Sequence, residues 1–129
     1  MAGTVPAGAP SKAHILVVED DGPYREVLGR LLQREGFEVS LTSDFRDALE
    51  ILETDRQIDL LLADIVMPDR VNGIALSRMA RLRRRDIKVV YITGYQIPGI
   101  DREALGPILR KPVAESVLIE EINRTLAGS

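Results

Sequence analysis

Five polar side chains stand at the ends of short apolar runs in the sequence, and their chemical types suit one kind of reaction. They are Glu19, Asp20, Asp64, Thr93 and Lys111. If each run is a strand of one parallel sheet, all five side chains meet at the edge where such sheets bind ligands, outside the carboxyl ends of the strands. Acidic groups with a hydroxyl and an ammonium provide what phosphoryl transfer requires: an oxygen nucleophile, ligands for a divalent cation and fixed hydrogen-bond donors.

The acidic residues of this group suit a magnesium site. Mg²⁺ prefers oxygen ligands, keeps several waters and uses one or two carboxylates. Asp20, with Glu19 and Asp64, meets that demand, and the cation would offset the repulsion between neighbouring carboxylates. Lys111 is expected to pair with Asp64 before the reaction and with the phosphoryl group after it. Thr93 is a hydroxyl donor for a phosphoryl oxygen.

The apolar runs alternate with amphipathic stretches, which predicts an α/β fold with a doubly wound parallel sheet between two helix layers. Runs 15–18, 60–63 and 89–92 are apolar throughout, as expected of strands covered on both faces. The predicted strands lie in HILVVE, FEVSL, IDLLLAD, IKVVYIT and PILRK, and the longer helices in PYREVLGRLLQREG, FRDALEILETD, IALSRMARLRRR and AESVLIEEINRTLA. Prolines and glycines between Tyr95 and Gly106 leave room for only a short fourth helix, around 101–105.

Capping residues and apolar spacing refine the helices. Asp21, directly before Gly22 and Pro23, is interpreted as the cap of the first helix rather than a metal ligand. Thr42 or Ser43 is expected to cap the second helix. The spacing predicts buried faces on the first and last helices. These faces comprise Val27, Leu28, Leu31 and Leu32, and Val117, Leu118, Ile122 and Leu126.

Length and composition indicate one domain. The chain has 129 residues, 45% of them hydrophobic, and a formal net charge of −3 with both signs interspersed. Residues 1–12 have the composition of a flexible tail, so the domain is predicted at 13–127. With no cysteine and a single histidine, His14, any metal must be held by oxygen.

Two further classes of partner are disfavoured by the sequence. No apolar run reaches the ~18 residues that span a bilayer, and the first residues lack the apolar stretch of a secretory signal, so a cytoplasmic protein without membrane contact is expected. The basic run 81–85 has no interleaved aromatic residues, and cations there suit the last turn of a helix. Nucleic-acid binding is therefore not expected.

The motifs VVEDD, DIVMP followed by Gly73, YITG and RKP, in this order, resemble the signature of response-regulator receiver domains over about residues 13–127. The resemblance implies five parallel strands in the order 2-1-3-4-5 with five flanking helices. It implies that Asp64 is the phosphoacceptor, that Glu19 and Asp20 bind Mg²⁺ with it, and that Thr93 and Lys111 are the switch hydroxyl and the site lysine. In the family the peptide bond between this lysine and the following proline is often cis.

The same resemblance implies a role in two-component signalling. The phosphoryl donor would be a histidine kinase or a histidine phosphotransferase, and the acceptor would change shape and thereby its protein contacts. Such a domain is not an enzyme acting on other molecules, since it catalyses only its own phosphorylation and dephosphorylation. A dimer that forms on phosphorylation is left open.

The sequence departs from the family pattern at three places. The interval from Asp64 to Gly73 is one residue longer than the commonest pattern, with the extra residue in 69–72. Ile108 stands where many members carry an aromatic switch residue, and we hypothesise that Tyr95 replaces it or shields the phosphoryl group. The interval from Thr93 to Lys111 is also short, which puts in doubt the surface that many relatives use for dimers or targets.

Two alternatives come from other functional classes. A magnesium-dependent phosphohydrolase with an aspartate nucleophile needs a second aspartate two residues later, where this chain has Val66, and it needs a capping domain for which the chain has no room. A receiver-like interaction module that works without phosphorylation is the second alternative. Ile108 and the short interval before Lys111 keep it open, whereas the complete set of site residues argues against it.

Overall fold

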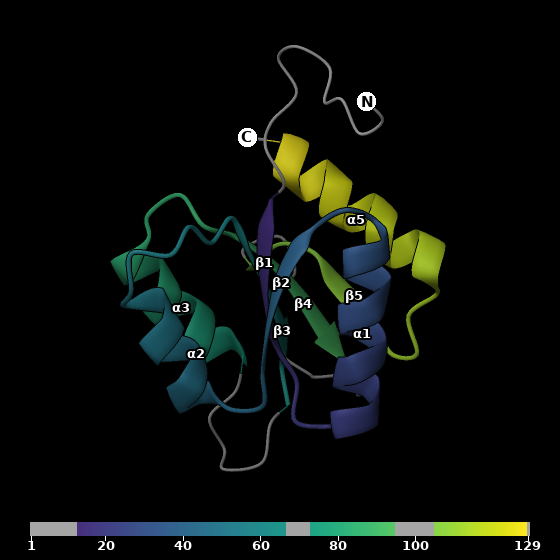
Figure 1. Ribbon diagram of the computed structural model, residues 1–129, viewed down its shortest axis with the longest axis horizontal. Coiled ribbons are helices and arrows are strands. Elements are labelled where there is room, and N and C mark those ends of the chain that lie inside the picture. The colour runs from purple at the N-terminus through teal and green to yellow at the C-terminus, as the bar shows by residue number, and fades with distance from the viewer. Residues whose placement is uncertain (1–12, 67–72, 95–104, 129) are drawn as a thin grey trace.

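The computed structural model describes residues 13–66, 73–94 and 105–128 (Figure 1). Four features predicted above therefore lie wholly or mostly outside the described residues. They are the tail at 1–12, the loop residues 69–72, Tyr95 and the short fourth helix around 101–105. The proposed domain limits stay a prediction for the same reason.

Strands and helices alternate along the described chain. The strands are β1 (His14–Val18), β2 (Glu38–Thr42), β3 (Leu60–Asp64), β4 (Lys88–Thr93) and β5 (Ile108–Arg110). The helices are α1 (Gly22–Arg34), α2 (Phe45–Leu52), α3 (Gly73–Arg83) and α5 (Glu115–Ala127). This division agrees with the one expected from apolar periodicity, apart from the fourth helix that the described residues do not cover.

The five strands form one parallel sheet in the order β2-β1-β3-β4-β5, which confirms the predicted topology. In its register Ile15 lies opposite both Val39 and Leu60, and Asp64 lies opposite Ile92. Every residue of β3 is buried, including Asp64, and the apolar run 60–63 predicts this for a central strand. Because all strands point the same way, their carboxyl ends share one edge.

Helices cover both faces of the sheet (Figure 1). On one face α2 and α3 contribute Ala48, Leu52, Leu76 and Ala80 to a core with Leu16, Val18, Leu61 and Tyr91. On the other, α1 and α5 contribute Leu28, Leu32, Leu118 and Ile122 to a core with Ile15, Val17, Leu60 and Val90. Alternate residues of each strand therefore enter opposite cores. Burial of these apolar side chains is the main favourable term that holds the layers together.

The first helix begins as its sequence predicts, but the second does not. Asp21 caps α1, where its carboxylate accepts a hydrogen bond from the Tyr24 backbone nitrogen at 3.2 Å. The cap of α2 is Asp44, which accepts from the Asp47 nitrogen at 2.9 Å, so the prediction of Thr42 or Ser43 was wrong. Thr42 instead belongs to β2, and its buried hydroxyl donates to the Val17 carbonyl at 2.8 Å.

Both predicted helix faces are narrower than expected. Val27 is 50% exposed and Val117 is 49% exposed, whereas their neighbours Leu28 and Leu118 are 2% and 1% exposed. Adjacent residues on a helix point about 100° apart. An apolar pair therefore does not reveal by spacing alone which member faces the sheet, and the assignment of both valines to the buried faces was wrong.

The basic run at the end of α3 attaches that helix to α2. Arg83 forms an ion pair with Glu53 at 3.3 Å, and the Arg84 guanidinium donates to the backbone oxygens of Leu52 and Thr54 at 3.1 and 2.7 Å. At least these two cations thus have a structural use. In the described part of the chain, no helix combines the length and the apolar character that crossing a bilayer requires.

Candidate functional site

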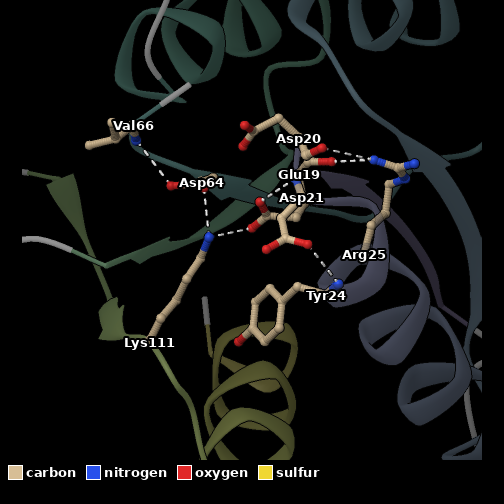
Figure 2. Close-up of polar contacts among 8 residues, drawn as sticks. All are labelled: Glu19, Asp20, Asp21, Tyr24, Arg25, Asp64, Val66 and Lys111. Carbon is tan, nitrogen blue, oxygen red and sulfur yellow. Dashed lines mark hydrogen bonds and ion pairs between the residues drawn. The ribbon is translucent and has the colours of Figure 1, made fainter. Parts of the chain in front are cut away.

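The carboxyl edge of the sheet gathers the side chains that the sequence singled out. Glu19 and Asp20 follow β1, Asp64 ends β3, Thr93 ends β4, and Lys111 follows β5. Figure 2 shows the carboxylates of Glu19 and Asp64 pointing toward the Lys111 ammonium, with Asp20 nearby. The predicted residues therefore share one edge, although four separate segments supply them.

Lys111 connects the two buried carboxylates. Its ammonium nitrogen lies 2.7 Å from Oδ2 of Asp64 and 2.6 Å from Oε1 of Glu19 (Figure 2). The other carboxylate oxygen of Asp64, Oδ1, accepts a hydrogen bond from the Val66 backbone nitrogen at 3.0 Å. Both oxygens of Asp64 are therefore oriented by donors. The peptide bond between Lys111 and Pro112 is cis, as the resemblance implied.

Three carboxylates form a group that could hold a metal ion. Glu19, Asp20 and Asp64 each offer an oxygen, and these oxygens lie within 4.8 Å of one another. Glu19 and Asp64 are buried, at 0% and 3% exposure, whereas Asp20 is exposed. This donor set is all oxygen and open on one side, which fits a hard cation that retains waters.

Burial and charge shift the ionisation of the site. Burial raises the pKa of Glu19 to about 6, although hydrogen bonds from Lys111 and from the Asp21 backbone favour the charged form. Burial alone would lower the pKa of Lys111, but its hydrogen bonds to Asp64 and Glu19 outweigh that cost and hold the pKa above its ordinary value. Lys111 is therefore a permanent positive charge beside two acidic groups.

Backbone contacts hold Thr93 and Lys111 next to Asp64. The Thr93 carbonyl oxygen accepts a hydrogen bond from the Lys111 backbone nitrogen at 2.8 Å. The Ile92 carbonyl oxygen accepts one from the Ile65 backbone nitrogen, also at 2.8 Å. Thr93 is 3% exposed and lies one residue beyond Ile92, the β4 residue opposite Asp64. The sheet hydrogen bonds thus carry Thr93 and Lys111 to the same edge as the carboxylates.

The first residue of α3 makes a close approach to the site. A Cβ atom on Gly73 would collide with the backbone oxygen of Asp64, and the Gly73 nitrogen donates to the Ile65 carbonyl at 3.0 Å. Only a residue without a side chain fits this approach. Ile108, where the family often has an aromatic residue, packs against the core beneath α2 and α3.

Two residues of the first turns of α1 were missed by the sequence analysis. The Arg25 guanidinium donates to the backbone oxygen of Glu19 at 2.8 Å and reaches that of Asp20 at 3.5 Å (Figure 2). The Tyr24 ring lies beside Lys111. A usable signal was their position in the first turn of the helix that follows the acidic pair, because that turn lies close to the end of β1.

Comparisons with known proteins agree with this geometry. The family model of the response regulator receiver domain matches residues 15–123. The chain is 34% identical to the response regulator receiver protein CpdR of Brucella abortus (strain 2308), over 89% of this chain and 98% of that protein. It is 33% identical to the response regulator MprA of Mycolicibacterium vanbaalenii, over 87% of this chain but only 49% of that protein.

The fold is likewise similar to solved structures. The crystal structure of a CheY-like response regulator receiver domain protein from Methanospirillum hungatei JF-1 matches with a TM-score of 0.81 and 29% identity. The match covers 90% of this chain and 94% of that one. The receiver domain of the hybrid histidine kinase CckA matches with a TM-score of 0.75 and 35% identity, over 88% of this chain and 99% of that one.

Proposed function

This chain belongs to the response regulator receiver family and has its role in two-component signalling, and we propose that it accepts the phosphoryl group on Asp64. The observation that carries the proposal is the contact of 2.7 Å between the Asp64 carboxylate and the Lys111 ammonium, in a group that also contains Glu19 and Asp20. An aspartate held in this way is a fixed oxygen nucleophile with a cation beside it.

In the proposed reaction an oxygen of Asp64 attacks the phosphorus atom of a phosphohistidine. The bond between phosphorus and the histidine nitrogen breaks, and its electron pair leaves with that nitrogen, so the product is an acyl phosphate on Asp64. The Lys111 ammonium, which pairs with the Asp64 carboxylate before the reaction, is near enough to pair with the phosphoryl oxygens after it. Thr93 would donate its hydroxyl hydrogen to one of those oxygens and thereby signal the change.

We propose Mg²⁺ as the cofactor, held by Glu19, Asp20 and Asp64. When bound, the ion would draw charge from the transferring phosphoryl oxygens. Two other residues would support the metal site. The Arg25 guanidinium fixes the backbone at Glu19, and Lys111 balances part of the acidic charge. The exposure of Asp20 leaves one side of the group open to water and to a donor.

The proposed partners follow from the family. A histidine kinase or histidine phosphotransferase would supply the phosphoryl group, and a protein contact altered by phosphorylation would be the output. A cytoplasmic location is part of this proposal, because the proposed donor proteins obtain their phosphoryl group from ATP, which is found in the cytoplasm. As a signalling module, the chain would catalyse only its own phosphorylation and dephosphorylation.

Intact-mass spectrometry after incubation with acetyl phosphate tests this proposal. The wild type is expected to gain one phosphoryl group in Mg²⁺ and little in excess chelator. Asp20→Asn is expected to slow the gain steeply, because it removes one of the proposed ligand charges. Asp86→Asn, which changes an exposed acidic residue before β4 at the opposite edge, serves as the matched control and should react like the wild type.

The outcomes distinguish a receiver that is phosphorylated from an interaction module with the same fold that works without phosphorylation. A gain that requires Mg²⁺ and falls in Asp20→Asn supports a phosphorylated receiver. No gain under any condition, with the protein folded, would favour the interaction module that works without phosphorylation. An equal rate in Asp20→Asn and the wild type would refute the metal assignment alone.

A further inference from the structure

Lys111 has a third neighbour besides its two carboxylate partners. Its ammonium nitrogen lies 5.0 Å from the centroid of the Tyr24 ring, and Figure 2 shows the ring beside the lysine, below the acidic residues. An ammonium within about 6 Å of a ring centroid is attracted by the negative face of the ring. The lysine therefore contacts two carboxylates and the face of an aromatic ring.

The Tyr24 ring is itself well fixed. Tyr24 is the third residue of α1, and its backbone nitrogen donates to the capping carboxylate of Asp21. Its side chain packs against the core beneath α1 and α5, which also receives the partly buried Val113. A tyrosine has only two side-chain torsions to order, so a ring packed against the core in this way is a rigid surface for a longer and more flexible side chain.

The ring rather than the hydroxyl faces the site. In Figure 2 the Tyr24 hydroxyl points away from the carboxylates and toward α5. The hydroxyl is buried and has no hydrogen-bond partner among the described residues. Burial raises the pKa of this phenol, so it stays neutral and leaves the charge balance of Lys111 and Glu19 unchanged.

Lys111 needs such support because its own strand is short. β5 has three residues at the edge of the sheet, and Lys111 lies just beyond its end with 21% of its side chain exposed. Phosphorylation would change its contact with Asp64, because the charge moves from the carboxylate to the phosphoryl oxygens. The attraction to the ring does not depend on that change and can keep the ammonium at the site in both states.

We propose that Tyr24 is a positioning residue whose ring holds the Lys111 ammonium against Asp64. The consequence for reaction rate rests on the proposed function, whereas the contact itself does not. Tyr24 would touch neither the phosphoryl group nor the metal ion, and it would act only through Lys111. This dependence on Lys111 distinguishes it from a residue that merely supports the fold.

The test compares Tyr24→Leu and Tyr24→Phe in the full chain. Leucine retains an apolar side chain without a ring, and phosphorylation by acetyl phosphate is expected to slow by about two- to fivefold, the range of an exposed cation–π contact. Phenylalanine retains the ring and is expected to restore the rate. In a Lys111→Ala background, Tyr24→Leu should cause no further loss, because the group through which it acts is gone.

A second readout does not require phosphorylation. Protons of the Lys111 ε-methylene group beside the ring should show an upfield ring-current shift by NMR in the wild type and Tyr24→Phe, and should lose it in Tyr24→Leu. If the wild type takes up no phosphoryl group yet shows this pattern, the proposed function fails and the positioning contact stands. If Tyr24→Leu unfolds, Tyr24→Met takes its place as the ring-free variant.

Three results would overturn the inference. The first is a wild-type rate in folded Tyr24→Leu. The second is an equal slowing by Tyr24→Leu with and without Lys111, which would indicate a general structural role. The third is the absence of a ring-current shift at Lys111 in the wild type.

Discussion

At the scale of single residues, one ammonium group balances two acidic side chains. Lys111 contacts both Glu19 and Asp64, and Glu19 is completely buried. A buried carboxylate without a partner is costly, and it lowers that cost by taking up a proton. The raised pKa of Glu19, about 6, therefore already reflects a compromise between burial and the stabilising contact with Lys111.

Replacing Lys111 should make this compromise visible. In Lys111→Met the pKa of Glu19 is expected to rise further above about 6, because a hydrogen bond and a positive charge that favour the ionised form are lost. Carbon-13 NMR titration of the Glu19 carboxyl group measures the change. Lys88→Met, at the opposite end of β4, is the control and should leave the titration unchanged. An unchanged midpoint in Lys111→Met would contradict the charge balance described here.

Arg25 should affect metal binding without being a ligand. Its guanidinium holds the backbone of Glu19, so Arg25→Ala is expected to weaken Mg²⁺ binding by roughly tenfold, as is usual when support behind a ligand is removed. Calorimetric titration with Mg²⁺ gives the affinity. Arg30→Ala removes an exposed cation from the same helix and should bind like the wild type. Equal weakening in both variants would point to net charge instead of backbone support.

At the scale of elements, strand direction and helix starts build the site. Parallel strands bring Asp64, Thr93 and Lys111 to one edge, and the cap at Asp21 starts α1 so that its first turns lie against that edge. The start of α3 approaches equally closely, since Gly73 lies against the backbone of Asp64. Small displacements of α1 or α3 should therefore change the positions of the site carboxylates.

Gly73→Ala tests the approach of α3. The new methyl group would collide with the backbone oxygen of Asp64, and we expect a loss of about 1–3 kcal/mol in the free energy of unfolding, the usual range for overpacking. Urea denaturation measures it. Gly94→Ala is the matched control: among the described residues a Cβ there meets nothing within 4 Å, so stability should change by less than about 0.5 kcal/mol. Similar values for both variants would refute the close contact.

Element types followed from the sequence because uninterrupted apolar runs are typical of strands covered on both faces, whereas the order of the strands was implied only by the resemblance to receiver domains. The site followed because each of its residues stands at a strand end, and parallel strands leave one possible meeting place. The exposure of Val27 and Val117 did not follow, since it depends on the rotation of each helix over the sheet. The cap of α2 did not follow because β2 includes Thr42 and the helix begins only at Phe45. Tyr24 and Arg25 were missed because their contacts, with Lys111 and with the end of β1, are made between separate elements.

At the scale of the whole molecule, two cores share one sheet, and strand β1 contributes to both. His14, at its start, is packed against β2, where its Nε2 lies 2.7 Å from the Ser40 hydroxyl oxygen. Burial lowers the pKa of His14 below 6.5, although the charge of Glu38 opposes the shift. Below that value the unfolded chain therefore binds more protons than the folded protein.

The stability of the fold should depend on pH through His14. Its contribution is present above pH 6.5 and is lost as the pH falls through its lower folded-state pKa. Urea denaturation between about pH 7.5 and about pH 5.5 should thus show a smaller decline of unfolding free energy in His14→Gln than in the wild type, since the window brackets the ordinary histidine pKa. All other titrating groups are common to both proteins. Identical declines of the unfolding free energy would therefore show that His14 does not contribute to the pH dependence.

We propose that Asp64 carries the phosphoryl group, and reductive trapping identifies the phosphorylated residue. Borohydride reduces an acyl phosphate on an aspartate to homoserine and releases phosphate, and peptide mass spectrometry then identifies the modified residue. After treatment with acetyl phosphate and Mg²⁺, we predict homoserine at position 64 alone, with none in Asp64→Asn. Homoserine at Asp20 or Asp21 instead, or equal labelling of Asp64→Asn, would contradict the account.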